Sequence, residues 1–178
     1  GGSWSAVRSQ GTRTSKGSES TGAIPFMKVV DAEMLAFSQG VTRRGSYAGY
    51  MHITHPEVEE FLDIRKPTGG DINRKCTNLH HGIVINDAFM ETIHRATKEE
   101  NFDDSWELID PHTQQVKKVV SARTLWVKLL QNRMETGEPY LMFEDAVKSY
   151  RAFYQTKQAR FAMKWTKRKQ PEWFHAIV

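Results

Sequence analysis

Residues 37–46 hold the side chains best suited to chemistry on a small ligand. This segment contains the amide of Gln39, followed by two adjacent guanidinium groups, Arg43 and Arg44, that lie between Gly40 and Gly45. A guanidinium is a rigid fork of donors that matches a phosphate or a base carbonyl, and glycine lets a loop change conformation. The pattern predicts a flexible, cationic loop suited to a nucleotide, although a solvated pair of surface arginines has the same composition.

The chain has few residues suited to thiol chemistry or to metal binding. Cys76 is the single cysteine among 178 residues, which excludes an internal disulfide or a thiolate metal cluster and favours a reducing compartment. The histidines do not recur at metal-ligand spacing with a carboxylate, so we expect no metal site. No apolar run approaches the ~20 residues of a membrane helix. We therefore expect a cytoplasmic protein without a membrane partner.

The net charge of +4 is unevenly distributed along the chain. Residues 148–178 carry eight Lys or Arg and one acidic residue, which leaves a net charge of −3 for residues 1–147. A mildly acidic body and a strongly basic tail are typical of two different kinds of sequence. We therefore predict a boundary near Val147.

A helix and a strand should hold the cationic loop in place. Pro25 suits the first turn of a helix, and an apolar stripe follows at helical spacing. This stripe, which we expect to pack in the core, consists of Met27, Val30, Met34 and Phe37. Residues 46–53 resemble a strand that follows the loop.

Further elements alternate between helical and extended patterns. A second helix is expected to open at Pro56 and to end at residues 67–70, with Val58, Phe61, Leu62 and Arg65 on one side. The remaining predictions are a buried strand at 80–85, a helix capped by Asn86 or Asp87, a hairpin of 106–109 with 116–120, a helix from Ser121 to Gly137, and a strand at 140–143. This alternation favours an α/β layered or barrel architecture.

An ordered series of motifs resembles the barrel of class I ribonucleoside-diphosphate reductase large (alpha) subunits, in their bacteriophage-like form. The motifs occupy residues 2–8 (GSWSAVR), 20–28 (STGAIPFMK), 38–46, 49–56 (GYMHITHP), 59–66 (EEFLDIRK), 67–70 (PTGG) and 86–90 (NDAFM). The resemblance covers about residues 1–147. It implies a partial subunit, either an internal fragment or one piece of a split subunit. The implied fold is about the first half of a ten-stranded α/β barrel, followed by a tail outside the family.

The resemblance also implies a function for the loops. The family reduces ribonucleoside diphosphates to deoxyribonucleotides for DNA synthesis, and its specificity loops bind an allosteric dNTP or ATP effector. The residues that match effector-binding positions are Arg8, Ser38, Gln39, Arg43 and Arg44. The residues that match substrate-binding positions are Gly1, Gly2, Gln39 and Arg43.

The catalytic cysteines of the family have no counterpart in this segment. Cys76 falls where the family has no catalytic thiol, so we interpret it as a buried or bystander cysteine. The resemblance implies that this segment binds no cofactor of its own, that Mg²⁺ accompanies the effector, and that the radical comes from a separate small subunit. The implied partners are the remaining large-subunit polypeptide, a second large subunit and a nucleoside diphosphate. The isolated chain is predicted to be inactive.

The basic tail leaves alternatives open. Its aromatic residues, interleaved with cations, are compatible with single-stranded nucleic acid, and its alanines with an ordinary amphipathic helix. We favour the non-homologous ending of an interrupted reading frame, and a native insertion is the third alternative. A non-enzymatic nucleotide- or nucleic-acid-binding fragment is therefore the second candidate function.

A half barrel should also expose an unpartnered inner face and unpaired strand edges. We expect Tyr47, Tyr50, Ile83 and Ile85 to line that face. The chain alone should then be marginally stable and should associate, either with copies of itself or with a complementary fragment.

Overall fold

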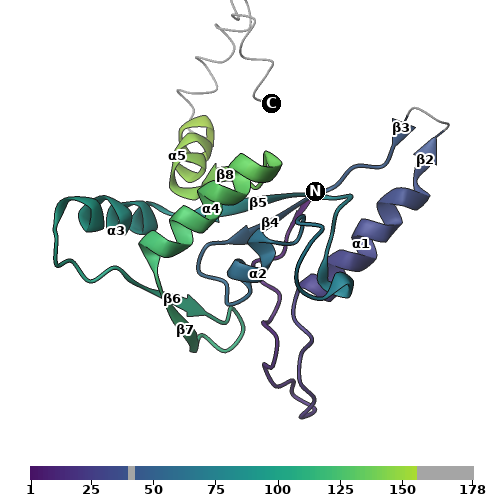
Figure 1. Ribbon diagram of the computed structural model, residues 1–178, viewed down its shortest axis with the longest axis horizontal. Helices are drawn as coiled ribbons and strands as arrows, with labels where there is room; N and C mark the ends of the chain where they lie inside the picture. Colours follow the sequence, from purple (N-terminus) through teal and green to yellow (C-terminus); the bar gives the residue numbers. More distant parts are fainter. Residues whose placement is uncertain (40–42, 156–178) are drawn as a thin grey trace, which may run out of the picture. The chain divides into compact units, whose positions relative to one another are not determined.

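A computed structural model describes residues 1–39 and 43–155 of the chain (Figure 1). Two predictions concern residues outside this description: the conformational freedom of the cationic loop at Gly40, and the nature of the basic tail beyond residue 155. The chain divides into a unit of residues 1–142 and a second unit of residues 143–178. In the second unit, α5 (Glu144–Gln155) begins with an acidic turn, in which Glu144 pairs with Lys148.

Four strands form the central sheet, in the order β1 (Gly2–Ser3), β4 (Ala48–His52), β5 (His80–Ile85) and β8 (Tyr140–Phe143). β1 runs parallel to β4, and β4 runs parallel to β5. The predicted strands at 80–85 and 140–143 are confirmed. The α/β class is also as expected, and in the described residues β1 and β8 stand at the two edges of this sheet.

Helices and two hairpins connect the strands of the sheet. The helices of the first unit are α1 (Ile24–Ala36), α2 (Val58–Leu62), the 3₁₀ turn η1 (Ile72–Arg74), α3 (Asp87–Lys98) and α4 (Ala122–Thr136). The hairpins are β2 (Ser38–Gln39) with β3 (Arg43–Arg44), and β6 (Ser105–Ile109) with β7 (Val116–Ser121). Along the described residues, none of the helices has the length and apolar character needed to cross a bilayer.

Local capping signals place the ends of α3 and α4 as predicted. The side chain of Asn86 accepts a hydrogen bond from the backbone N–H of Phe89, at 3.0 Å. Ser121 accepts one from the N–H of Thr124, at 3.1 Å. Gly137 ends α4 with a φ of 77°, the left-handed conformation that glycine adopts without strain.

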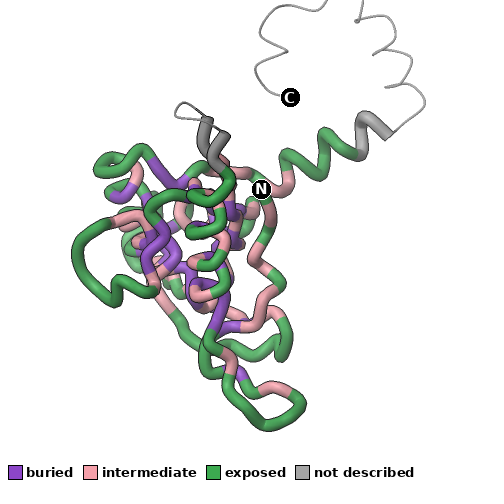
Figure 2. Tube along the Cα trace, turned by 90° about the vertical axis from the view of Figure 1, so that its right-hand side faces the viewer, coloured by how far each residue is buried: buried purple, intermediate pink, exposed green. Residues whose placement is uncertain are grey.

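One hydrophobic core joins the helices of the first unit to one face of the sheet, and Figure 2 shows its buried residues gathered in the middle of that unit. The register pairs Tyr50 with Gly82 and Met51 with Ile83. Because side chains alternate along a strand, Tyr50 and Ile83 lie on opposite faces. Ile83 and Ile85 are fully buried in the core. The prediction that they line an open inner face together with Tyr50 is therefore wrong, whereas Tyr47 packs against the same core as Ile83 and Ile85.

The buried face of α1 differs from the predicted stripe. Met27 is buried as expected, but Phe37 is 60% exposed, and Asp31 is buried instead. The carboxylate of Asp31 accepts the backbone N–H groups of Asn78, at 2.7 Å, and Leu79, at 2.9 Å. These two bonds tie α1 to the segment that leads into β5, and they turn an acidic residue toward the interior.

The second helix is shorter than its apolar pattern indicated. α2 ends at Leu62, and the chain continues in tight turns in which Asp63 and Ile64 bond back to Glu60 and Phe61. Arg65 therefore lies beyond the helix. Its guanidinium donates to the backbone oxygen of Leu79, at 2.6 Å, and so holds this turn against the start of β5.

Candidate functional site

The loop of residues 8–22, here called the N-terminal loop, connects β1 to α1. It folds back on itself through backbone bonds from Gly11 to the oxygen of Ser20, at 2.9 Å, and from Thr14 to the oxygen of Ser18, at 2.8 Å. Arg13 and Lys16 are exposed on this loop, and Arg8 is half-buried at its start. The loop therefore presents cationic donors on a backbone that is closed by its own hydrogen bonds.

The start of the N-terminal loop is fixed next to the end of β4. Trp4 donates its backbone N–H to the oxygen of Tyr50, at 2.7 Å. Nε2 of His55, a buried residue just after β4, lies 2.8 Å from the backbone oxygen of Val7. Arg8 is thus held beyond the C-terminal end of β4.

A buried carboxylate from the β6–β7 hairpin holds the body of the loop. Asp110 Oδ2 accepts the N–H of Ser9, at 2.8 Å, the hydroxyl of Ser9, at 2.5 Å, and the hydroxyl of Thr12, at 2.7 Å. Burial alone would raise the pKa of Asp110, but these bonds and one from the N–H of Thr113 outweigh it and hold that pKa well below its ordinary value. Asp110 is therefore ionised when the loop is in place.

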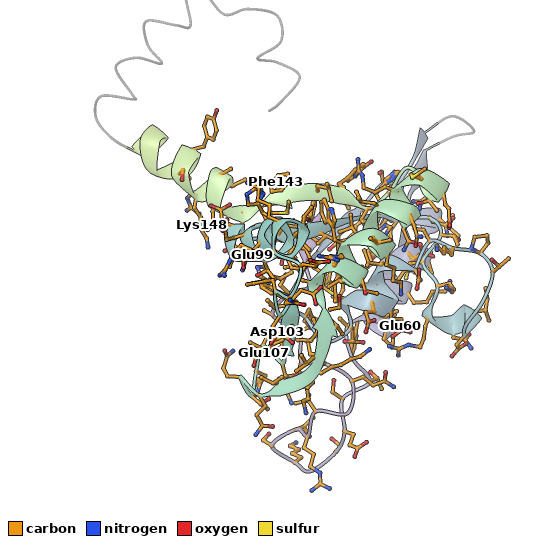
Figure 3. All side chains as sticks on the ribbon, turned by 60° about the vertical axis from the view of Figure 1, so that its left-hand side comes forward. Glu60, Glu99, Asp103, Glu107, Phe143 and Lys148 are labelled. Atoms are coloured by element: carbon orange, nitrogen blue, oxygen red, sulfur yellow. The ribbon has the colours of Figure 1, made fainter. Side chains whose placement is uncertain are left out.

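A second buried carboxylate holds the end of the loop. Glu57 accepts the N–H of Ala23, at 2.8 Å, where α1 begins, and pairs with Arg74, at 3.1 Å. Arg74 also binds Glu60, which reaches the surface (Figure 3). Burial raises the pKa of Glu57 above its ordinary value, despite these favourable partners. Gly22 has a φ of 88°, and a Cβ there would overlap the Glu57 carboxylate, so the junction requires glycine.

The β2–β3 hairpin carries the sequence-predicted loop. Its register sets Gln39 opposite Arg43 and Ser38 opposite Arg44. The N–H of Gly45 closes the hairpin by donating to the backbone oxygen of Phe37, at 2.7 Å. The structure therefore brings these four residues together along the backbone, while their side chains lie outside its description.

The two N-terminal glycines lie beside the start of β4. A Cβ on Gly1 would lie 2.7 Å from the backbone oxygen of Ala48, and a Cβ on Gly2 would lie 2.6 Å from the hydroxyl of Tyr47. A side chain at Gly1 would therefore meet backbone, whereas one at Gly2 would displace the end of the Tyr47 side chain. β3 ends at Arg44, a few residues before β4, so these glycines and the hairpin share one end of the sheet.

The predicted residues thus separate into two groups. Gly1, Gly2 and the hairpin lie at the start of β4, whereas Arg8 lies beyond its end. The N-terminal loop precedes α1 and the hairpin follows it, so the 13 residues of that helix, ~20 Å in length, separate the two loops (Figure 1). A nucleotide held by one loop would have to extend the full length of α1 to reach the other in the same chain.

Cys76 is fully buried, as expected of a bystander. Burial chiefly, with a contribution from Asp31, raises the pKa of its thiol to about 12. A thiol with such a pKa carries almost no thiolate near neutral pH and is a poor nucleophile.

Sequence reasoning missed Asp110 and Glu57, which hold the N-terminal loop. An aspartate followed by Pro111 is a turn signal, and it does form the predicted turn of the β6–β7 hairpin. Nothing local indicates that the same side chain also binds Ser9, which is 101 residues away in the sequence.

Comparison with known proteins identifies one family, in agreement with the resemblance found in the sequence. Residues 1–161 match the family model described as the barrel domain of ribonucleotide reductase, and this match includes part of the segment after Val147. The ribonucleoside-diphosphate reductase large subunit of Invertebrate iridescent virus 6 is 47% identical over 148 residues, which are 83% of this chain and 15% of that protein.

Two further relatives carry similar names. The putative ribonucleoside-diphosphate reductase large subunit of Frog virus 3 is 47% identical over 144 residues, which are 81% of this chain and 23% of that protein. The ribonucleoside-diphosphate reductase subunit alpha of Helicobacter pylori (strain J99) is 31% identical over 149 residues, with 71% of this chain and 18% of that protein covered. The chain therefore spans less than a quarter of the length of these relatives.

Proposed function

Because this chain belongs to the ribonucleotide reductase family and matches its barrel domain, we propose that it is part of a ribonucleoside-diphosphate reductase large subunit. The complete subunit reduces ribonucleoside diphosphates to deoxyribonucleotides. This segment supplies the loops that read the substrate and the effector, while the catalytic thiols come from other polypeptide. The observation that supports this division of labour is that the single cysteine, Cys76, is fully buried and has a thiol pKa raised to about 12.

The substrate is assigned to the start of β4. Gly1 and Gly2 carry no side chains, so their backbone groups are available to a diphosphate at this end of the sheet, and the neighbouring hairpin carries Gln39 and Arg43. A guanidinium and an amide together can donate to phosphate oxygens and to the carbonyl groups of a base. We assign substrate binding to Gly1, Gly2, Gln39 and Arg43.

The effector, a dNTP or ATP with its Mg²⁺, is assigned to both loops. The N-terminal loop offers Arg8, Arg13 and Lys16 to a triphosphate, and the hairpin reads the base. The effector residues are Arg8, Ser38, Gln39, Arg43 and Arg44. Since these residues lie at opposite ends of α1, one effector contacts both groups most simply when two copies of the subunit contribute.

An exposed apolar strip on α1 favours such a pair of copies. Phe26 is 55% exposed and Val29 is 66% exposed, and their spacing of three residues places them on one side of the helix. Phe37, which directly follows α1, is 60% exposed. Two copies related by a two-fold axis can cover this strip with α1 helices that run antiparallel. The N-terminal loop of one copy then lies beside the hairpin of the other. The second copy, the remaining large-subunit polypeptide and a radical-generating small subunit are the partners of this segment.

Substrate choice tests the proposal. The chain is combined with the polypeptide that completes the subunit and with the small subunit, and the deoxynucleotides formed from a mixture of the four diphosphates are measured. Arg43→Ala should change the ratio of products under a fixed effector. Lys117→Ala, which removes an exposed cation from β7, is the control and should leave that ratio unchanged. An unchanged ratio in Arg43→Ala would contradict the assignment of the hairpin.

A further inference from the structure

The carboxylate of Asp110 divides its two oxygens between two loops. Oδ2 accepts three hydrogen bonds from the N-terminal loop, given by the backbone and hydroxyl of Ser9 and by the hydroxyl of Thr12. Oδ1 accepts three bonds within the hairpin that Asp110 belongs to, from the N–H groups of His112 and Thr113 and from the hydroxyl of Thr113. One buried charge therefore joins the β6–β7 turn to the N-terminal loop.

We propose that Asp110 is a positioning residue for nucleotide binding: by anchoring the N-terminal loop at Ser9 and Thr12, it holds the cations of that loop in the geometry that grips a triphosphate. This inference rests on the proposed function, because it deepens the role of that loop as an effector site. Asp110 itself is fully buried and touches the loop's own polar groups rather than the ligand.

Charge and burial explain why this anchor is strong. An ionised acceptor roughly doubles the strength of a hydrogen bond, and loss of the three loop donors would leave the buried Oδ2 atom without a partner. Ser9 and Thr12 are themselves buried, and their hydroxyl groups lie 3.1 Å apart. The anchor is therefore a closed polar cluster, and water cannot replace its donors without opening the loop.

The anchor acts on the cations through a short stretch of chain. Arg8 directly precedes Ser9, and Arg13 directly follows Thr12, so the two anchored residues lie next to two of the three cations. Arg13 also forms a backbone bridge with Glu19 across the loop. Release of Ser9 and Thr12 from Asp110 would therefore move both arginines, while the bonds that Asp110 accepts within the β6–β7 hairpin stayed in place.

The two oxygens of Asp110 provide a matched pair of variants. Thr12→Val removes a hydroxyl donor from the loop side, and Thr113→Val removes one from the hairpin side of the same carboxylate. Ser121→Ala, which removes the cap of α4, destabilises the fold without touching either loop. Thr12→Ser restores the hydroxyl and serves as the rescue variant.

Two readouts are measured on the full chain. Tryptic cutting after Arg13 and Lys16 reports release of the loop, and equilibrium binding of dTTP with Mg²⁺ reports the site. Thr12→Val should speed the cutting about tenfold and weaken dTTP binding about tenfold, as expected for a lost bond to a buried charge. Thr113→Val and Ser121→Ala should change both by less than about twofold, and Thr12→Ser should restore both.

Two results would overturn the inference. The first is that Thr12→Val and Ser121→Ala have equal effects, or that Thr12→Val changes neither the rate of cutting nor the binding of dTTP. Asp110 would then be an ordinary structural residue. If the unmodified chain bound no dTTP while cutting still depended on Thr12, the proposed nucleotide site would fail, and the positioning role with it, although the anchor would stand. The two readouts therefore separate a failure of the anchor from a failure of the proposed function.

Discussion

The carboxylate of Glu138 accepts two hydrogen bonds from His81, one from its backbone N–H and one from its ring Nδ1, each at 3.1 Å. A carboxylate only accepts, so Nδ1 of His81 must carry the proton. Glu138 also binds the ring of His80 and lies 3.5 Å from Nε of Arg65. A single buried acid thus joins the segment before β8 to the start of β5.

Stability should fall in acid because of Glu138. Burial raises the pKa of this group, but the bonds from His81 and His80 outweigh burial and lower it to about 2 from an ordinary 4.5. A lowered folded-state pKa stabilises the fold above the unfolded value, and this stability is lost as the pH falls from about 4.5 toward 2. The free energy of unfolding, measured by denaturant melts, should lose about 2 kcal/mol from this group between about pH 6 and pH 3.

Glu138→Gln isolates the contribution of this acid. The variant should be less stable than the parent chain near neutral pH, and it should lose less stability on acidification. Glu135→Gln, which changes a 58% exposed acid paired with Lys66, is the control and should keep the parent's pH dependence. Parallel pH profiles for Glu138→Gln and the parent chain would refute the role of Glu138.

Gly22→Ala should destabilise the junction between the N-terminal loop and α1. Gly22 and Gly17 both have left-handed φ angles, 88° and 83°, but only at Gly22 would a Cβ meet the Glu57 carboxylate. Gly17→Ala should therefore cost about 1 kcal/mol for its backbone conformation, and Gly22→Ala about 1–3 kcal/mol more for the overlap. Equal denaturant midpoints for the two variants would show that the Glu57 contact does not matter.

The elements that the sequence predicted well are those whose cause is local. The side chain of Ser121 accepts a hydrogen bond from an N–H only three residues further along the chain, and the side chain of Asn86 does the same. These short-range patterns therefore specify where α4 and α3 begin. Asp110 and Ser9 are 101 residues apart, and no short-range pattern records their pairing. The exposure of Phe37 was missed for a related reason, because periodicity shows that a helix has an apolar side but does not show what covers it.

The exposed strip of α1 should control self-association. Phe26→Ser should shift the chain toward smaller species in sedimentation velocity, because it places a polar group in the apolar strip. Leu35→Ser is a matched control: Leu35 is 52% exposed against 55% for Phe26, but it lies nine residues further along and so on the opposite side of the helix. If both variants associate like the parent chain, or if both dissociate, α1 does not carry the proposed contact.

Formation of deoxynucleotide tests the central claim most directly. The chain is assayed with CDP and the small subunit, first alone and then together with the polypeptide that completes the large subunit. The chain alone should form no deoxycytidine diphosphate, since its single thiol, Cys76, is buried with a pKa of about 12. The completed subunit should form it steadily. Steady product from the chain alone, or none from the completed subunit, would contradict the assignment of this chain as the loop-bearing part of a reductase.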